Sequence, residues 1–281
     1  MARILDTQSV VDVVAALVKK ACCELDGGYV AALREARDRE ESPYGREVLQ
    51  TLADNAEYAA KEGLACCQDT GSCAVFMEIG QEVSWQGAPL ADMVDEGVRR
   101  GYTGAYLRKS MVRDPIDRVN SGDNTPAILH TDIVPGAAVS VTVLPKGGGC
   151  ENMGVFTTLL PSAGEAGLID FVVKTVEQAG GKSCPPLTVG VGAGGTMDYC
   201  CLLAKRALLR PHGSRSPAPR YARLEAELLE RINQTGIGPM GLGGRITALD
   251  VRIEQYPCHI TAFPIAVSLQ CHAARIARAE I

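Results

Sequence analysis

The stretch Leu187-Thr188-Val189-Gly190-Val191-Gly192-Ala193-Gly194-Gly195-Thr196 decides the class of fold. The β-branched and aliphatic residues of Leu187–Val191 predict a short buried strand. The glycines after Val191 predict a turn, and the residues from there through Leu209 predict a helix. A strand, a glycine-rich turn and a helix in this order are the building unit of proteins that alternate the two kinds of element.

The same glycines test a specific function, because Gly190, Gly192 and Gly195 match the G-x-G-x-x-G spacing of dinucleotide-binding loops. Such loops place an acidic ribose ligand about twenty residues further on. The segment Leu209–Gly213 stands there and contains no acid. The sequence therefore argues against an NADP-type cofactor. The turn is expected to expose backbone N–H groups at a helix N-terminus, which suits a carboxylate or phosphate, or simply to reverse the chain.

Working outward, the sequence predicts further elements on both sides of this unit. Helical spacing of apolar residues covers most of residues 8–62. We expect a mixed α/β (α+β) fold, with a helical N-terminal part of about residues 1–62 packed on a glycine-rich α/β catalytic domain, and a single domain over residues 1–281. Further strands are predicted at 74–79, 128–133, 138–144, 187–191 and 248–254, and helices at 90–108, 169–179, 224–233 and from about 271 to the end.

Composition and charge exclude several classes of protein. The chain has 281 residues, 46% hydrophobic and 22% charged, with a net charge of −5, so it is long enough to bury a core and is not disordered. The mildly acidic net charge does not indicate the basic surface that binds nucleic acid or anionic lipid. No signal peptide and no apolar run of about 18 residues are present, so we expect no membrane partner and a cytoplasmic location.

The number of cysteines, eleven, is the unusual feature of the composition. Disulfides are rare in a reducing cytoplasm, so the cysteines are expected to be core thiols, reactive thiols or metal ligands. The helical pairs Cys22-Cys23 and Cys200-Cys201 are expected in the core. Because local C-x-x-C repeats are absent, any metal site has to gather cysteines from distant segments.

Three cysteines stand in settings that favour ligation. Cys67 opens a Cys-Gln-Asp-Thr-Gly loop, Cys184 precedes two prolines, and Cys271 is expected at the start of the last helix. Amide dipoles at a loop or a helix N-terminus stabilise thiolates. Three thiolates can hold a [4Fe–4S] cluster with one iron lacking a protein ligand, although eleven cysteines allow many other triples. The amides of Lys146–Gly149 predict a further anion-binding nest.

Seven motifs in order along the chain give it a family resemblance. The sequence resembles the α-subunit of the two-subunit class I fumarate hydratase and L-tartrate dehydratase family, a family of iron–sulfur hydro-lyases, over essentially its whole length. The motifs are Cys67–Gly71, Leu107–Ser110, Arg118–Pro126, Lys146–Gly149, Cys184–Pro186, Gly236–Pro239 and Gly241–Gly244.

The resemblance implies a fumarate hydratase that interconverts fumarate and L-malate, with L-tartrate dehydratase or a non-catalytic iron–sulfur sensor as alternatives. It implies a [4Fe–4S] cluster with one iron not ligated by protein, and a C4 dicarboxylate substrate. It also implies a β-subunit, in an α2β2 assembly, that completes the active site. By motif position the cluster ligands are Cys67, Cys184 and Cys271, the catalytic residues are Asp69 and His259, and the substrate-binding residues are Gln68, Arg108 and Gly148.

The sequence departs from the family pattern at Cys150 and in the surroundings of Cys271, which match less closely than those of Cys67 and Cys184. Cys150 occupies a place after the triple glycine where serine is common in the family, and we interpret it as a neutral replacement. Cys66, next to Cys67, is expected to point away from the cluster. His272, next to Cys271, has two possible roles: it supports the cluster ligands or it is a surface residue.

Overall fold

The computed structural model describes residues 2–281, which form two compact units. The first unit contains residues 2–26, Asn55–Gly148 and Arg275–Ile281, and the second contains Gly27–Asp54 and Gly149–Ala274. One boundary lies inside helix α3 (Pro43–Glu62), so the chain crosses between the units within a continuous helix. The mixed α/β class is confirmed. The single catalytic domain stays a prediction, because a division into compact units does not show which parts fold alone.

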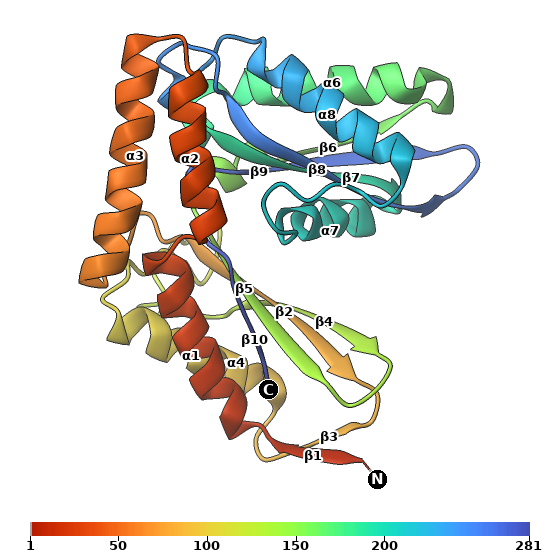
Figure 1. Ribbon diagram of the computed structural model, residues 1–281. Helices are drawn as coiled ribbons and strands as arrows, with labels where there is room; N and C mark the ends of the chain where they lie inside the picture. Colours follow the sequence, from red (N-terminus) through yellow and green to blue (C-terminus); the bar gives the residue numbers. More distant parts are fainter. Residues whose placement is uncertain (1) are drawn as a thin grey trace. The chain divides into compact units, whose positions relative to one another are not determined.

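The first unit is a four-stranded sheet with the order β10-β5-β2-β4. Strand β2 pairs parallel with β4 and antiparallel with β5, and β10 pairs antiparallel with β5. Figure 1 shows α1 and α4 lying side by side along this sheet, and a small parallel pair, β1-β3, at its far end. The elements are β1 Arg3–Asp6, α1 Gln8–Cys23, β2 Ser72–Gly80, β3 Val83–Gln86, α4 Leu90–Gly104, β4 Ile128–Val134, β5 Val139–Lys146 and β10 Ala277–Glu280.

Two glycines allow the helices of the first unit to pack closely. A Cβ added at Gly97 of α4 would come 2.6 Å from Cβ of Val14 in α1, and one at Gly101 would come 2.7 Å from Cβ of Val18. The four-residue spacing puts both glycines on one face of α4. The two helices together cover a buried apolar core that includes Val75, Met77 and Ile79 at alternate positions of β2, as the period of a strand requires.

The second unit is a four-stranded sheet with the order β6-β9-β7-β8. Helices α6 and α8 lie on one face of this sheet and α7 on the other (Figure 1). Strand β7 is central, parallel to β8 and antiparallel to β9. The elements are α2 Gly27–Arg39, α5 Gly148–Glu151, β6 Val155–Leu159, η1 Pro161–Ala163, α6 Gly164–Ala179, η2 Gly180–Ser183, β7 Leu187–Gly195, α7 Met197–Leu208, α8 Pro219–Asn233, η3 Pro239–Gly241, β8 Ala248–Cys258 and β9 Phe263–Gln270.

The glycine stretch that decides the fold has a different local structure from the predicted turn. Gly192, Gly194 and Gly195 belong to β7, which continues through Gly195. A Cβ at Gly190 would lie 2.2 Å from the carbonyl oxygen of Ala204, and one at Gly192 would lie 2.1 Å from that of Cys200. These two glycines are therefore needed because α7 packs directly on the strand, and not because the chain turns around a ligand.

Most predicted elements are confirmed, and one is wrong. The three N-terminal helices are present, although α1 belongs to the first unit and α2 to the second. The helix predicted from Cys271 to the end does not form, because Ala277–Glu280 pairs with β5 and the side chain of Ala277 is buried there. The gain from pairing and burial outweighs the helix propensity of this alanine-rich segment. No helix within residues 2–281 combines the length and the apolar character needed to cross a membrane.

Candidate active site

The Cys67–Gly71 loop of the first unit fixes the carboxylate of Asp69. Oδ1 accepts a hydrogen bond from the backbone N–H of Gly71 at 3.0 Å, and Oδ2 accepts one from the backbone N–H of Gly148 at 2.8 Å. Asp69 as a whole residue is half-buried. The structure thus brings Asp69 and Gly148 together as predicted, but it uses the N–H of Gly148 to orient the acid.

Two glycines make room for this arrangement. Gly71 has φ +68°, and a Cβ there would lie 1.9 Å from the carbonyl oxygen of Lys146. A Cβ at Gly147 would lie 3.0 Å from Oδ2 of Asp69 and 3.2 Å from Nη2 of Arg275. The predicted amide nest at Lys146–Gly149 therefore lies against the chain's own carboxylate. Glycine is required here because another group approaches closely.

Arg275 is a residue of this loop region that the sequence analysis missed. Its side chain is fully buried, and its Nη1 donates a hydrogen bond to the backbone carbonyl of Asp69 at 2.5 Å. This hydrogen bond from a buried guanidinium fixes the position of the Asp69 peptide. The sequence analysis expected a helix from about residue 271 to the end and assigned no role to Arg275.

The loop also holds Arg108. Oγ1 of Thr70 donates to the backbone carbonyl of Arg108 at 2.9 Å, while the hydroxyl of Tyr102 donates to the carbonyls of Thr70 and Gly71. Arg108 itself is exposed, and over residues 2–281 its guanidinium has no hydrogen-bonding or ionic partner. A planar guanidinium held in place by its backbone suits a carboxylate ligand. Gln68 is also exposed, one residue from Asp69.

Asn124 connects the Arg118–Pro126 motif to this loop. Its amide nitrogen donates to the carbonyl of Gly71 at 3.1 Å, and its Oδ1 accepts from the backbone N–H groups of Ser110 and Met111. The side chain is fully buried, and its φ of +66° lies in the left-handed region that asparagine tolerates. The side chain of Asn124 therefore connects three loops by hydrogen bonds, in addition to the role of this residue in a turn.

The second unit brings Cys184 and Cys271 together. The backbone N–H of His272, next to Cys271, donates to the carbonyl of Cys184 at 3.1 Å. Cys184 has φ +54° and ψ +64°, a left-handed conformation that costs a residue with a Cβ about 1 kcal/mol. Such an outlier persists only where the surroundings hold it, and it points to a functional position. Cys67 lies in the other unit, and neither unit alone, over residues 2–281, gathers three His, Cys, Asp or Glu side chains as metal ligands.

The Cys184 turn rests on the glycine-rich loop before β8. The backbone N–H of Met240 donates to the carbonyl of Pro185 at 2.8 Å, and a Cβ at Gly241 would lie 2.5 Å from Cα of Gly181. The motifs Cys184–Pro186 and Gly236–Gly244 are thus parts of one packed structure. The close approach of Gly241 to Gly181 leaves no room for a side chain at position 241.

Glu40 anchors the far end of that loop and was also missed. Its carboxylate is fully buried and accepts hydrogen bonds from the backbone N–H groups of Glu41, Ser42, Arg245 and Ile246, at 2.7 to 2.9 Å. Burial alone would raise the pKa of Glu40, but these four donors together hold it below the usual value. The sequence gives no periodic signal for such a residue at the end of a helix.

The structure places His259 at the opposite end of the second unit's sheet from Cys184 and Cys271. His259 lies in the turn between β8 and β9, whereas Cys271 follows the last residue of β9. Its Nδ1 lies 2.8 Å from Oγ1 of Thr261 and accepts the backbone N–H of the same residue at 3.3 Å. The imidazole is exposed. Within their common unit, His259 and the two cysteines therefore do not form one site.

The remaining cysteines divide into buried and exposed thiols. Burial raises the pKa of Cys22 to about 12, that of Cys66 to about 11 and that of Cys200 to about 12. Cys150 is buried as well, as a neutral replacement would be. Cys201 is exposed, which corrects the expectation that both helical pairs are in the core, because it lies on the outer side of α7. None of the eleven cysteines is in a disulfide.

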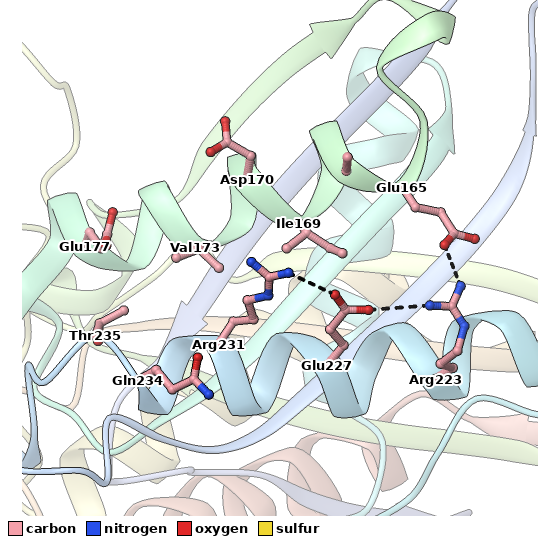
Figure 2. Close-up of a pocket in the computed structure, with 11 residues that line it drawn as sticks. Glu165, Ile169, Asp170, Val173, Glu177, Arg223, Glu227, Arg231, Gln234 and Thr235 are labelled. Carbon is pink, nitrogen blue, oxygen red and sulfur yellow. Dashed lines mark hydrogen bonds and ion pairs between the residues drawn. The ribbon is translucent and has the colours of Figure 1, made fainter.

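A hollow of about 630 Å³ lies elsewhere in the second unit, between α6 and α8. Figure 2 shows that a chain of ion pairs crosses it, from Glu165 through Arg223 and Glu227 to Arg231. These side chains are partly or fully exposed, so the pairs contribute little to stability. The hollow contains none of the predicted site residues.

Comparison with known proteins gives a consistent family. The family model described as "Fumarate hydratase (Fumerase)" matches residues 11–280. A putative L(+)-tartrate dehydratase subunit alpha of Methanocaldococcus jannaschii is 40% identical over 270 residues, 94% of each chain. The L(+)-tartrate dehydratase subunit alpha of Escherichia coli K12 is 34% identical over 250 residues, 88% of this chain and 82% of that protein. With a family model over nearly its whole length and relatives of this similarity, the chain belongs to the fumarate hydratase (Fumerase) family of hydro-lyases.

Proposed function

We propose that the chain is the α-subunit of a fumarate hydratase, which adds water to fumarate to form L-malate and catalyses the reverse reaction. The observation that carries this proposal is that Asp69 is oriented by two backbone N–H groups, while the adjacent Thr70 donates its hydroxyl to the backbone carbonyl of Arg108, whose guanidinium has no partner among residues 2–281. A hydro-lyase for a dicarboxylate needs such a proton-transfer group next to a carboxylate-binding cation.

The thiols of Cys67, Cys184 and Cys271 would hold a [4Fe–4S] cluster. The donor set fits: all three are outside disulfides, and Cys184 and Cys271 lie on backbone segments joined by a hydrogen bond. The cluster would supply an iron without a protein ligand, which is a Lewis acid that assists C–O cleavage. The eleven thiols suit the reducing cytoplasm, where we place the enzyme.

The chain's own residues would bind and orient the dicarboxylate and move protons. Arg108 would pair with one substrate carboxylate, and Gln68 and Gly148 would contribute hydrogen bonds. In the dehydration direction a base removes the proton from the carbon next to the hydroxyl-bearing carbon. The C–O bond then breaks with its electron pair on oxygen, and an acid protonates the departing hydroxide to give water. Asp69 and His259 would share these two roles.

The names of the relatives also support a partner subunit for this chain. The relatives described above are named alpha subunits. We therefore include a β-subunit, in an α2β2 assembly, that supplies the remaining substrate contacts. The isolated α-chain is expected to bind iron but to show little or no turnover.

A second candidate is L-tartrate dehydratase, because the relatives described above carry that name. The residues that would bind a C4 dicarboxylate do not discriminate between the two substrates, since L-tartrate differs from malate by one hydroxyl group.

The test is anaerobic co-expression with the β-subunit, followed by assays of fumarate, L-malate, mesaconate and L-tartrate. Turnover of fumarate and L-malate is expected. Turnover of L-tartrate without L-malate would replace the first candidate by the second, and no turnover of any of these substrates would refute both.

The ligand assignment has its own test, the iron content per chain. Replacing Cys67, Cys184 or Cys271 by serine should abolish iron binding. The matched controls are Cys66→Ala, next to Cys67, and Cys150→Ala, two buried thiols outside the ligand set. Equal loss of iron in both groups would contradict the assignment.

A further inference from the structure

Gln270 is a buried amide that the proposed mechanism does not use. It is the last residue of β9, directly before the proposed ligand Cys271, and it is 1% exposed. Glutamine is rarely buried to this extent, because the amide loses its hydrogen bonds to water. A side chain of this kind in the interior therefore needs a specific contact that offsets the loss.

The amide NH2 group of Gln270 closes the bend that carries Cys271. Its Nε2 donates a hydrogen bond to the backbone carbonyl of Ala273 at 3.2 Å, and Sγ of Cys271 lies 3.9 Å from the same carbonyl oxygen. Because a carbonyl oxygen only accepts hydrogen bonds, the NH2 group and not Oε1 must face it. The side chain before the ligand and the thiol of the ligand thus meet at one backbone oxygen.

The other end of the amide shows that this contact has a cost. Oε1 of Gln270 is buried and has no hydrogen-bond donor within residues 2–281. A buried acceptor without a donor is destabilising, and methionine, which has nearly the same length, would avoid the penalty. The stability of the fold alone therefore does not favour glutamine at this position.

Pairing within the sheet does not require the amide either. Gln270 lies opposite Thr188 of β7, and the hydrogen bonds of the ladder are made by the backbone. Two residues earlier, on the same face of β9, Ser268 lies opposite Gly190, and both residues are small. The long polar side chain thus stands where the strand ends and the ligand follows.

The bend has a second anchor at Cys184. The backbone N–H of His272 donates to the carbonyl of Cys184 at 3.1 Å. Cys271 is therefore flanked by two hydrogen bonds, one from the side chain of Gln270 and one from the backbone of His272. Groups that orient a metal ligand from outside the coordination sphere change the affinity for the metal, and the surroundings of the sulfurs tune iron–sulfur clusters.

We infer that Gln270 is a positioning residue for the cluster ligand Cys271. Its NH2 group holds the carbonyl of Ala273, and with it the bend that carries the thiol. This inference rests on the proposed function, since Cys271 is a ligand only if the chain binds the cluster. Gln270 acts through Cys271 and takes no part in proton transfer.

The test is Gln270→Met, compared with wild type in the α/β-subunit complex prepared without oxygen. Methionine keeps the length of the side chain and removes the NH2 group together with Oε1. We expect the iron content per chain to reach the wild-type value after anaerobic reconstitution, but iron to be lost to a chelator about tenfold faster. The EPR spectrum of the reduced cluster should shift, because the orientation of one thiolate has changed.

Urea denaturation of the iron-free complex separates this role from a structural one. Because Gln270→Met removes a buried oxygen that has no donor, the midpoint of unfolding should equal that of wild type. The matched control is Ser268→Ala, which changes a buried polar residue on the same face of β9. The control should alter neither the rate of iron loss nor the spectrum.

Three results would overturn the inference. The first is an unchanged rate and spectrum in Gln270→Met. The second is a Gln270→Met complex that fails to fold or unfolds at lower urea concentration, and the third is equal acceleration in Ser268→Ala, because either would assign the glutamine to the fold and not to the ligand. A wild-type complex that binds no iron would instead refute the proposed function, so the two failures are distinguishable.

Discussion

Each unit contains one carboxylate that accepts hydrogen bonds from backbone N–H groups and lies beside a glycine. The two carboxylates differ in how far they remain available to another molecule. Glu40 accepts four such hydrogen bonds and is fully buried, and a Cβ at Gly244 would lie 2.6 Å from its Oε1. Asp69 accepts two and is only half-buried. Glu40 is fully used by the fold, whereas Asp69 keeps oxygen lone pairs for another molecule. Remaining exposure therefore separates a structural acid from a candidate catalytic one.

The largest expected effect is on activity, from Asp69→Asn. The amide keeps the size of the side chain and one acceptor oxygen but does not transfer protons as the acid does. We expect turnover of the α/β-subunit complex to fall by about 10²–10⁴-fold. The free energy of unfolding, measured by urea denaturation, should change by less than about 1 kcal/mol. Retained turnover would remove Asp69 from the mechanism.

Glu40→Gln is the corresponding change in the other carboxylate. It should lower the stability of the fold strongly and the turnover only slightly. The amide NH2 group would face backbone N–H donors, which leaves at least one buried donor unsatisfied. We expect a loss of about 2–3 kcal/mol in the free energy of unfolding, with turnover of the folded enzyme within about twofold of wild type. If the activity fell as far as in Asp69→Asn, the distinction between the two acids would be lost.

Acid should remove the contribution of Glu40. Because the pKa of Glu40 is lowered in the folded state, its stabilising effect is present above the pKa of the unfolded chain, about 4.3, and is lost as the pH falls through the folded value. The stability difference between wild type and Glu40→Gln, measured by urea denaturation at several pH values, should be constant from about pH 5 to 7. It should shrink at lower pH. A difference that grew on acidification would contradict this sign.

A smaller effect is expected from Gly147→Ala. The new methyl group would meet Oδ2 of Asp69 and Nη2 of Arg275, both of which are side-chain atoms that can move. We expect turnover to fall about tenfold, a barrier increase of about 1.4 kcal/mol, because the carboxylate is displaced from its orientation. The control is Gly104→Ala, since a Cβ at Gly104 of α4 meets nothing within 4 Å. Equal activity of the two variants would show that the position of Asp69 is not critical.

The sequence predicts the elements of this fold better than the contacts between them. Periodic apolar residues were sufficient for β2, β4, β5 and the long helices, because burial of one face produces that period. The glycines of β7 were misinterpreted as a turn, because close packing of α7 leaves the same residue pattern as a turn does. The last segment was wrong because its pairing with β5, more than 130 residues away, is not encoded locally.

In the candidate site, too, local motifs were predicted better than contacts between distant residues. The residues around Cys67 were found as a short motif, and the structure does place Asp69, Arg108 and Gly148 around one loop. Arg275, Asn124 and Glu40 were missed or undervalued, because each acts through a backbone atom that is distant in sequence. The motif predicts a catalytic role for His259, but its separation from Cys271 depends on the length of β9 and is visible only in the structure.

The burial of thiols described above has a consequence for the chemistry of the newly made chain. A thiol reacts as the thiolate, and burial raises the pKa of both Cys22 and Cys200 to about 12, so both stay in the unreactive protonated form at neutral pH. Alkylating agents and oxidants will therefore modify the exposed Cys201 and Cys258 long before these two. Folding itself thus sorts a cysteine-rich sequence into protected and reactive sulfur, and mass-spectrometric labelling of the native chain can report that order directly.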